Sequence, residues 1–287
     1  MSCTIEGGGI HFDFSSCAAQ LGSGKNVPLT HTMAVAYFCI KMMIDPDLPV
    51  NEGLYRSISI DAPLGSVVNP VAPAGVSSRN LTGMILADVI MDALGQAAPS
   101  RALASGGPYQ GIILSGTDPR NGPFFVDYEN FAGGQGAWCD SDGNDVTQVQ
   151  TTNTNNLPIE VMEAEFPIRV EKYELVADSG GAGRHRGGLG VCRDLRILLD
   201  DALLTVRSAR QRFPAQGISG AAAGALGAFI LNPGTSKEQK LGSTFSEMRL
   251  ERGDILRIVS PGGGGYGPPA ERPREAVEKD WREGKTL

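Results

Sequence analysis

The sequence has 287 residues, a formal net charge of −7, 41% hydrophobic residues and 20% charged residues, values that suit one large globular domain or two smaller ones. The negative charge argues against a general affinity for nucleic acid or anionic membranes, because both need a basic face. Glycine accounts for 38 residues, nearly twice its usual share of about 7%, so many tight turns and close backbone contacts are expected.

The sequence has none of the features of a membrane or secreted protein. Its apolar runs fall short of the ~20 residues of a membrane-spanning helix, and its first residues, MSCTIEGGGIHFDF, lack the basic and apolar regions of a signal peptide. Five cysteines are widely spaced without a CxxC pair, which is typical of reduced thiols and not of a disulfide framework or a zinc ribbon. We therefore expect a cytoplasmic protein with neither nucleic acid nor membrane among its partners.

The first hundred residues are expected to combine strands with helices. Apolar and polar side chains alternate over residues 10–14 and again over residues 57–62, as in strands with one buried face. Residues 28–44 are apolar nearly all round, which is typical of a helix buried against this chain or another, and Pro46 ends it. A second helix is expected to begin at an Asn80 N-cap and to end before the next proline. Its apolar face is expected to carry Leu81, Ile85, Val89 and Leu94.

The remainder is expected to be mostly β structure. Short apolar runs stand between clusters of glycine, proline and asparagine, and no long helical period occurs before the charged final segment. We therefore predict an α+β protein: an α+β segment with two buried helices at 1–100, a β-rich mixed-sheet core at 101–270, and a short charged C-terminal helix at 271–287. The runs interpreted as strands are GIILSG, PFFVDY, RVEKYELV, DLRILL, ALLTVRS, GAFILN and ILRIV.

Two glycine-rich segments match nucleotide-binding loops only in part. LGSGKN, at 21–26, lacks the first glycine of a phosphate-binding loop and has Asn26 where Ser or Thr would bind magnesium. GGAGRHRGGLG, at 180–190, has Arg186 in place of the third glycine of a dinucleotide fingerprint and lies between predicted strands. The sequence has no GxSxG elbow to mark a serine nucleophile. Plain glycine turns are the favoured interpretation of both segments.

The histidines and aspartates do not predict a complete metal site in this chain. The three histidines form no HxH or HExxH pair, and a lone histidine is more often hydrogen-bonded than metal-bound. Asp140, Asp142 and Asp145 surround Gly143 and could offer oxygens to calcium, but the glutamate at the twelfth position of an EF-hand loop is missing. A solvated turn is the favoured interpretation. The histidines are His11, His31 and His185.

A set of four arginines follows a predicted turn at Asp178 and Ser179. Guanidinium groups near a turn can hold an anion, because they donate paired hydrogen bonds to carboxylates and phosphates. Pairing with nearby acidic residues explains them at least as well, and both interpretations stay open. The arginines are Arg184, Arg186, Arg193 and Arg196.

The most informative polar pattern lies between residues 131 and 165. Asn153, Asn155 and Asn156 precede Glu160, and amide side chains suit recognition of amides or carboxylates because they both donate and accept hydrogen bonds. Glu160 and the glutamate three residues later would share a face if this stretch forms a helical turn. A ligand-facing loop and a self-satisfied turn network fit the pattern equally well.

Five ordered blocks of the sequence carry a family resemblance. The most recognisable is TTNTNNLPIEVMEAEFPIRVEKYELVADSGGAGRHRGGLGVCRDLRIL. The others are FDFSSCAAQLGSGKNVPL, DPDLPVNEGLYRSISIDAPLGSVVNP, FAGGQGAWCDSDG and PGGGGYGPPAERPREAVEKDWREGK. Together they span the sequence from about Ile5 to Lys285 and resemble the C-terminal half of a subunit of the hydantoinase B / oxoprolinase family.

The resemblance implies a subunit that works with a hydantoinase A-type partner, which binds ATP. Such pairs open cyclic amides, such as hydantoins, lactams or 5-oxoproline, through a phosphorylated substrate, and a sister branch carboxylates ketones. ATP with magnesium is then expected on the partner subunit, in keeping with the missing phosphate-binding loop in this sequence.

The sequence departs from the family pattern in one decisive way. Typical members are much longer, and their first half carries a His- and Asp-rich block, GD-x-x-x-x-NDPY-x-GG-x-H-x-x-D, that looks like the family's metal site. That block is missing here, so we expect either a naturally split subunit or a fragment. The divalent metal is then expected on another polypeptide that carries the N-terminal half of the fold. Ser16-Cys17 also replaces the Gly-Thr expected after Ser15, which leaves any role of that turn open.

The resemblance leads to three hypotheses of function. The first is a subunit of an ATP-dependent cyclic amidohydrolase, which is expected to be inactive as an isolated chain. It would complete the active site with Asn153 and Asn155 as substrate-binding residues, and Gly133 and Gly134 would bring backbone close to the substrate. Glu160 is then the candidate acid/base, provided that it is buried. The second is a subunit of an ATP-dependent ketone carboxylase. The third is a non-catalytic assembly subunit, which the missing metal half and the apolar helix favour.

Overall fold

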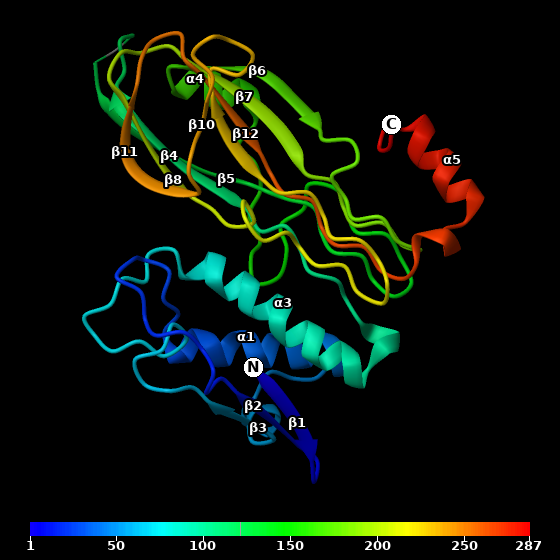
Figure 1. The fold of residues 1–287 in the computed structure, drawn as a ribbon. Coiled ribbons are helices and arrows are strands. Elements are labelled where there is room, and N and C mark those ends of the chain that lie inside the picture. The colour runs from blue at the N-terminus through cyan, green and yellow to red at the C-terminus, as the bar shows by residue number, and fades with distance from the viewer. Residues whose placement is uncertain (121) are drawn as a thin grey trace. The chain divides into compact units, whose positions relative to one another are not determined.

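The computed structural model describes residues 1–120 and 122–287 (Figure 1). The chain divides into two compact units: residues 1–105 with 150–152, and residues 106–149 with 153–287. The long helices belong to the first unit, the second unit is built mainly of strands, and a short helix stands near the C-terminus. The predicted α+β class is therefore confirmed.

A three-stranded sheet belongs to the first unit. β1 pairs antiparallel with β2, and β2 pairs in parallel with β3. Strand alternation turns Phe12, which is fully buried, to one face and His11 to the other. Both strands predicted in this region are confirmed, and β1 is an addition to them. The strands are β1 (Ser2–Glu6), β2 (Gly9–Asp13) and β3 (Ile58–Asp61).

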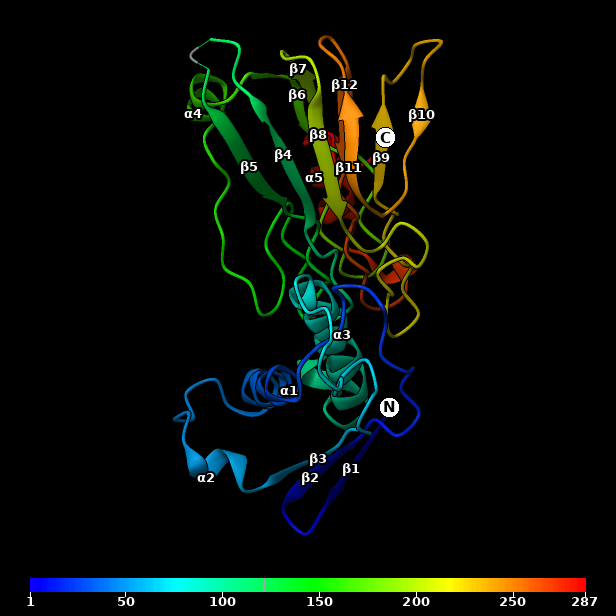
Figure 2. The same cartoon turned by 90° about the vertical axis from the view of Figure 1, so that its left-hand side faces the viewer.

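Two helices pack against one another in the first unit (Figure 2). α1 (Leu29–Ile44) confirms the predicted apolar helix. α3 (Arg79–Ala97) begins before the predicted N-cap, so Asn80 lies inside the helix and does not cap it. The predicted apolar face is also wrong at Val89, which is 43% exposed, because packing decides which positions of a helix are buried. A short helix, α2 (Glu52–Tyr55), lies between them in sequence.

Two antiparallel sheets share one hydrophobic core in the second unit. Their strand orders are β10-β9-β12-β7-β6 and β11-β8-β4-β5, and the core joins Leu114 of one sheet to Leu195 and Phe229 of the other. This is a β-sandwich. All seven predicted strand runs are found. The bounds are β4 (Gln110–Thr117), β5 (Phe124–Phe131), β6 (Ile168–Leu175), β7 (Val191–Ile197), β8 (Ala202–Arg207), β9 (Ala228–Leu231), β10 (Gln239–Lys240), β11 (Thr244–Leu250) and β12 (Ile255–Val259).

Long irregular segments of the second unit pack backbone to backbone beyond the strand ends (Figure 1). The Gly188 amide donates to the Gln135 carbonyl at 2.7 Å, and the Gly263 amide donates to the Gly188 carbonyl at 2.9 Å. A β carbon on Gly188 would lie 2.0 Å from the Asn144 carbonyl oxygen, so no other residue fits there. We call these segments the glycine layer, and their packing accounts for much of the high glycine content. They comprise residues 131–149, 176–190, 214–227 and 260–267.

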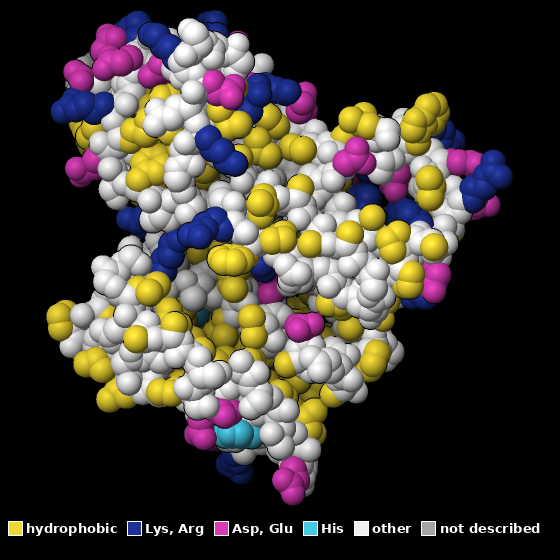
Figure 3. Space-filling model, viewed as in Figure 1, with side chains coloured by type: hydrophobic (Ala, Val, Ile, Leu, Met, Phe, Trp, Pro, Cys, Tyr) yellow, Lys and Arg dark blue, Asp and Glu magenta, His cyan; other side chains and the backbone are white. Residues whose placement is uncertain are grey.

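Two short helices belong to the second unit. α4 (Ile159–Glu165) follows the asparagine-rich stretch, and α5 (Arg274–Arg282) confirms the charged C-terminal helix. Acidic and basic side chains are interspersed on the face seen in Figure 3. Within the described residues, no helix is both long and apolar enough to cross a membrane.

Candidate functional site

The residues predicted to bind substrate lie in the loop before α4 and in its first turn. Asn153 and Asn155 are exposed, and so is Glu160, which does not meet the condition of burial on which its acid/base role depends. The amide of the neighbouring Asn156 donates to the phenolic oxygen of Tyr173 at 3.0 Å. The loop thus combines one internal contact with two exposed asparagine side chains, and the roles of Asn153, Asn155 and Glu160 stay predictions.

The two glycines predicted to bring backbone close to a substrate are buried in the glycine layer. A β carbon on Gly134 would lie 1.9 Å from the Gly188 carbonyl oxygen, and one on Gly133 would lie 2.3 Å from that of Gly107. The Gly134 amide donates to the Pro261 carbonyl at 2.9 Å. The close approach that these glycines allow is therefore to the chain's own backbone, and contact with a substrate stays a prediction.

Two of the three clustered aspartates hold the C-terminal segment in place. Asp142 accepts two hydrogen bonds of 2.7 Å from Arg272, and Asp145 lies 3.0 Å from Arg186 and 3.2 Å from Lys285. Burial opposes ionisation of both carboxyls, but these hydrogen bonds and charges outweigh it and lower the pKa of each. The prediction of a solvated turn is wrong for Asp142 and Asp145, because their partners come from more than forty residues away.

The residues described do not fit the divalent metal or the ATP that the family resemblance implies. No group of three or more His, Cys, Asp or Glu side chains in this part of the chain could hold a metal ion. In the loop at 21–26, the amide of Asn26 accepts from the Leu21 amide at 2.7 Å and donates to the carbonyls of Leu21, Ser23 and Gly75. The side chain of Asn26 thus fills the inside of the turn, where a phosphate would have to lie.

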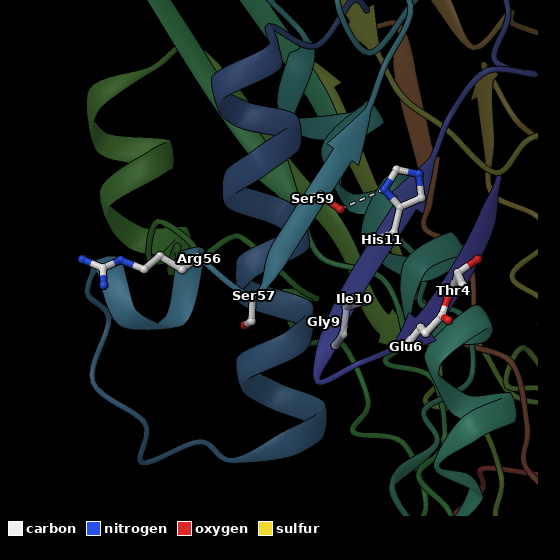
Figure 4. Close-up of a pocket in the computed structure, with 8 residues that line it drawn as sticks. All are labelled: Thr4, Glu6, Gly9, Ile10, His11, Arg56, Ser57 and Ser59. Atoms are coloured by element: carbon white, nitrogen blue, oxygen red, sulfur yellow. Dashed lines mark hydrogen bonds between the residues drawn. The ribbon is translucent and has the colours of Figure 1, made fainter.

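A cavity of about 430 Å³ opens on the polar face of the sheet in the first unit (Figure 4). Strand register places Thr4 opposite His11, and His11 opposite Ser59, so one polar side chain from each strand stands in a row. Arg56 extends away from the His11–Ser59 pair in Figure 4. The lining residues are Thr4, Glu6, Gly9, Ile10, His11, Arg56, Ser57 and Ser59.

His11 engages both of its ring nitrogens in this cavity. Nδ1 lies 2.8 Å from Ser59 Oγ, and Nε2 lies 3.5 Å from Asp61 Oδ2. A neutral imidazole can accept at one nitrogen and donate at the other, so this row can relay a proton between a hydroxyl and a carboxylate. The side chains of His11 and Asp61 are 38% and 77% exposed, and water therefore weakens these interactions. The site can act as an acid or base only where a covering partner excludes water.

The polar residues of this cavity follow a pattern in the sequence, but the pattern does not show which strands lie next to one another. The alternation in HFD at 11–13 and in SISID at 57–61 places polar residues on one face of each predicted strand. What joins them is a parallel pairing between strands 48 residues apart. Sequence reasoning treated His11 as a lone histidine, because it could not assign that pairing.

Comparison with known proteins assigns this fold to a family. A family model described as Hydantoinase B/oxoprolinase matches residues 1–269, so the chain belongs to the hydantoinase B/oxoprolinase family, as the sequence blocks predicted. The chain is 30% identical over 288 residues to a putative D-/L-hydantoinase B-type subunit of Pseudomonas sp. (strain NS671), covering 98% of this chain and 48% of that protein.

Two solved structures share the fold. The crystal structure of the ATP-dependent caprolactamase from Pseudomonas jessenii matches with a TM-score of 0.84 and 28% identity, over 99% of this chain and 51% of that chain. Acetone carboxylase, in a nucleotide-free structure, matches with a TM-score of 0.78 and 18% identity, over 99% of this chain and 43% of that one, which is a likeness of fold alone. The chain spans about half the length of these relatives.

Proposed function

We propose that this chain is part of an ATP-dependent enzyme that opens cyclic amides of the hydantoin, lactam or 5-oxoproline type with water. The observation that carries the proposal is the match of nearly the whole chain to the caprolactamase structure at 28% identity, together with its membership of the hydantoinase B/oxoprolinase family. The isolated chain is expected to be inactive, because it spans about half of such a subunit.

The proposal places the cofactors elsewhere in the assembly. ATP with magnesium would be held by a hydantoinase A-type subunit, and a divalent metal by a polypeptide that carries the N-terminal half of the hydantoinase B fold. Support for this division comes from the side chain of Asn26, which fills the inside of its glycine turn.

Within such an assembly, His11 is the residue of this chain best placed to move a proton. Ring opening adds water to a carbonyl and requires a proton on the departing amide nitrogen. Ser59 and Asp61 would fix the orientation of the imidazole. Asn153 and Asn155 would offer amide groups to the substrate, and an assembled partner would have to cover Glu160 before it could act as an acid or base.

The test is turnover by the assembled enzyme. The chain would be recovered with its partners from its own host, and the complex supplied with ATP and 5-oxoproline, hydantoin or caprolactam in turn. The expected result is ATP-dependent release of the open-chain amino acid or carbamoyl amino acid from one of the three. Consumption of acetone that requires bicarbonate, without ring opening, would make the complex a carboxylase. A complex that does neither would leave the chain with an assembly role.

A further inference from the structure

Arg193 is a buried cation at one edge of the β-sandwich. It stands on the inner face of β7 and is 1% exposed. Its guanidinium carbon lies 4.0 Å from the ring centroid of Tyr173, its register partner on β6, and 4.6 Å from that of Phe131 on β5 of the facing sheet. Aromatic rings from both sheets therefore pack against the guanidinium group and leave its N–H edge as the part that still needs partners.

The hydrogen-bonding groups of Arg193 are unsatisfied. Its Nε, Nη1 and Nη2 atoms are buried and make no hydrogen bond to any residue that the structure describes. A guanidinium group stays charged and carries five N–H donors, and burial of such a group without partners is strongly unfavourable. Other arginines near it in sequence are paired: Arg186 with Asp145, and Arg196 with Glu171.

Two acidic side chains face the same interior. Asp127 and Glu129 lie on the inner face of β5 and are 3% and 7% exposed, and Asp127 Oδ2 also has no hydrogen-bond partner among the described residues. Burial raises the pKa of Asp127 to about 6. Burial, followed by the charge of Asp127, raises the pKa of Glu129 to about 7, although the charge of Arg193 opposes both shifts. Below about pH 6, most of these carboxyls therefore carry protons that they can donate.

A cavity of about 280 Å³ lies beside this interior and is lined in part by Tyr173, Leu175 and Val191. Leu175 pairs with Val191 next to the Tyr173–Arg193 pair in the same register, and Tyr173 both lines the cavity and contacts the guanidinium group. Tyr173 is 41% exposed, and its hydroxyl is held by the Asn156 amide at 3.0 Å.

We propose that Arg193, Asp127 and Glu129 form a binding site for a small carboxylate anion, which enters through the cavity beside Tyr173. A carboxylate accepts two parallel hydrogen bonds from a guanidinium edge and, being planar, fits between two aromatic rings. A tetrahedral phosphate would turn its remaining oxygens toward those rings. The site stands independently of the proposed hydrolase activity, because it needs neither ATP nor a partner.

The first experiment measures formate binding to the full chain. Ligand-observed NMR, at constant ionic strength set with chloride, would give the affinities of formate and of inorganic phosphate. Saturable formate binding is expected, and Arg193→Met should weaken it at least tenfold. Arg196→Met is the matched control, because Arg196 lies on the same strand in a half-exposed pair with Glu171, and it should bind formate as the unaltered chain does. Equal formate affinity in Arg193→Met, or tighter binding of phosphate than of formate, would overturn the proposal.

A second variant keeps Arg193 and changes only the acids. Formate affinity should rise as pH falls from 8 to 6, because protonated Asp127 and Glu129 stop competing for Arg193 and can donate to the anion. Asp127→Asn/Glu129→Gln should bind formate several-fold more tightly at pH 8 and lose this pH dependence. Two further acids near the strand pair, Glu174 and Asp194, are engaged by Lys172 and Arg257. An unchanged pH profile in the double variant would contradict the site.

Discussion

Arginines of the second unit have two contrasting kinds of surroundings. In one, which we call the paired cluster, every arginine meets carboxylates at hydrogen-bond distance, and Arg272 alone contacts Asp142 and Asp280 at 2.7 and 2.6 Å. In the other, Arg193 has aromatic rings beside it and no hydrogen bond within the described chain. The paired cluster consists of Arg186, Arg272, Asp142, Asp145, Asp280 and Lys285.

The difference shows which charged side chains stabilise the fold through ion pairs and which one could still bind a ligand. The paired cluster holds α5 and the last residues against the glycine layer, and each of its charged side chains lies in an ion pair within the chain. The side chain of Arg193 makes no hydrogen bond to the described residues, so the chain gains less from its charge than from its packing. This contrast predicts different outcomes when each arginine is replaced.

Removal of an arginine from the paired cluster should have the largest effect. Arg272→Met leaves Asp142 and the buried Asp280 without their main partner, and we expect a loss of about 3–4 kcal/mol in the free energy of unfolding, because a buried carboxylate is left uncompensated. Urea unfolding measures the loss. Arg252→Met is the control, since Arg252 pairs with Asp200 at the exposed surface and should change stability by less than about 0.5 kcal/mol. Similar losses of unfolding free energy in the two variants would contradict a structural role for the paired cluster.

The carboxyls of the paired cluster and the carboxyls beside Arg193 should change the stability of the fold with pH in opposite directions. The pKa of Asp142 and Asp145 is lowered, so the stability they contribute is present above the unfolded-state values near 4 and is lost as pH falls through their folded-state pKa. The pKa of Asp127 and Glu129 is raised to about 6 and about 7, so the chain is most stable with both protonated and loses that stability as pH rises from about 4 to 7.

The loss of stability with rising pH that Asp127 and Glu129 are expected to cause can be measured separately. Asp127→Asn/Glu129→Gln removes both titrating groups and should gain on the order of 6 kcal/mol relative to the unaltered chain between pH 4 and pH 8, since each pKa is raised by more than two units and one unit corresponds to about 1.4 kcal/mol. Urea unfolding at a series of pH values reports the difference. Glu171→Gln, at a half-exposed pair, should leave the pH profile as it was. A constant difference between the double variant and the unaltered chain would mean that the acids keep ordinary titration in the fold.

His11, Ser59 and Asp61 in the first unit provide a third case, in which the polar side chains are partly exposed to water. His11→Gln should change the free energy of unfolding by less than about 0.5 kcal/mol, because the ring is 38% exposed. In the assembled enzyme, the same variant should lower kcat by about a hundredfold if His11 moves a proton. Ser59→Ala should lower it less, because it removes an orienting contact and keeps the imidazole. Unaltered kcat in both variants would exclude this cavity from the chemistry.

Replacement of Arg193 should change the free energy of unfolding much less than replacement of Arg272. Arg193→Met keeps the bulk between Phe131 and Tyr173 and removes a guanidinium group that has no hydrogen-bond partner among the described residues, so we expect a change within about 1 kcal/mol or a modest gain. The comparison with Arg272→Met, in the same urea experiment, sharpens the contrast between the two groups. A loss as large as that of Arg272→Met would show that Arg193 is a structural charge after all.

Much of the fold could be predicted from hydrophobic periodicity, and the failures have local physical causes. The apolar helix α1 and seven strands follow from patterns of 3.6 and 2 residues. β11 was missed because its register shifts between Phe245 and Met248, and Glu247 has a positive φ of 57°, which breaks the alternation. The start of α3 was misplaced because Ser78, the residue at its N-cap, makes no side-chain cap hydrogen bond, so no capping signal marks it.

The candidate sites were harder to predict, because each depends on contacts between distant segments. The four arginines after Asp178 look alike in sequence. Only the folded chain distinguishes Arg186, which contacts Asp145 from 41 residues away, from Arg193, whose guanidinium makes no hydrogen bond to a carboxylate in the part of the chain that the structure describes. Gly133 and Gly134 lie close to the chain's own backbone carbonyls, which periodicity cannot predict, and their contact with a substrate stays a prediction.

The most direct test of the proposed function is an omission experiment with the assembled enzyme. The ATP-binding and metal-carrying partners would be prepared with and without this chain, and ATP-dependent opening of 5-oxoproline, hydantoin and caprolactam would be measured for both preparations. We predict that ring opening requires this chain and returns when the purified chain is added back. Equal rates in its absence, or no ring opening by the complete assembly with ATP and metal supplied, would contradict the account.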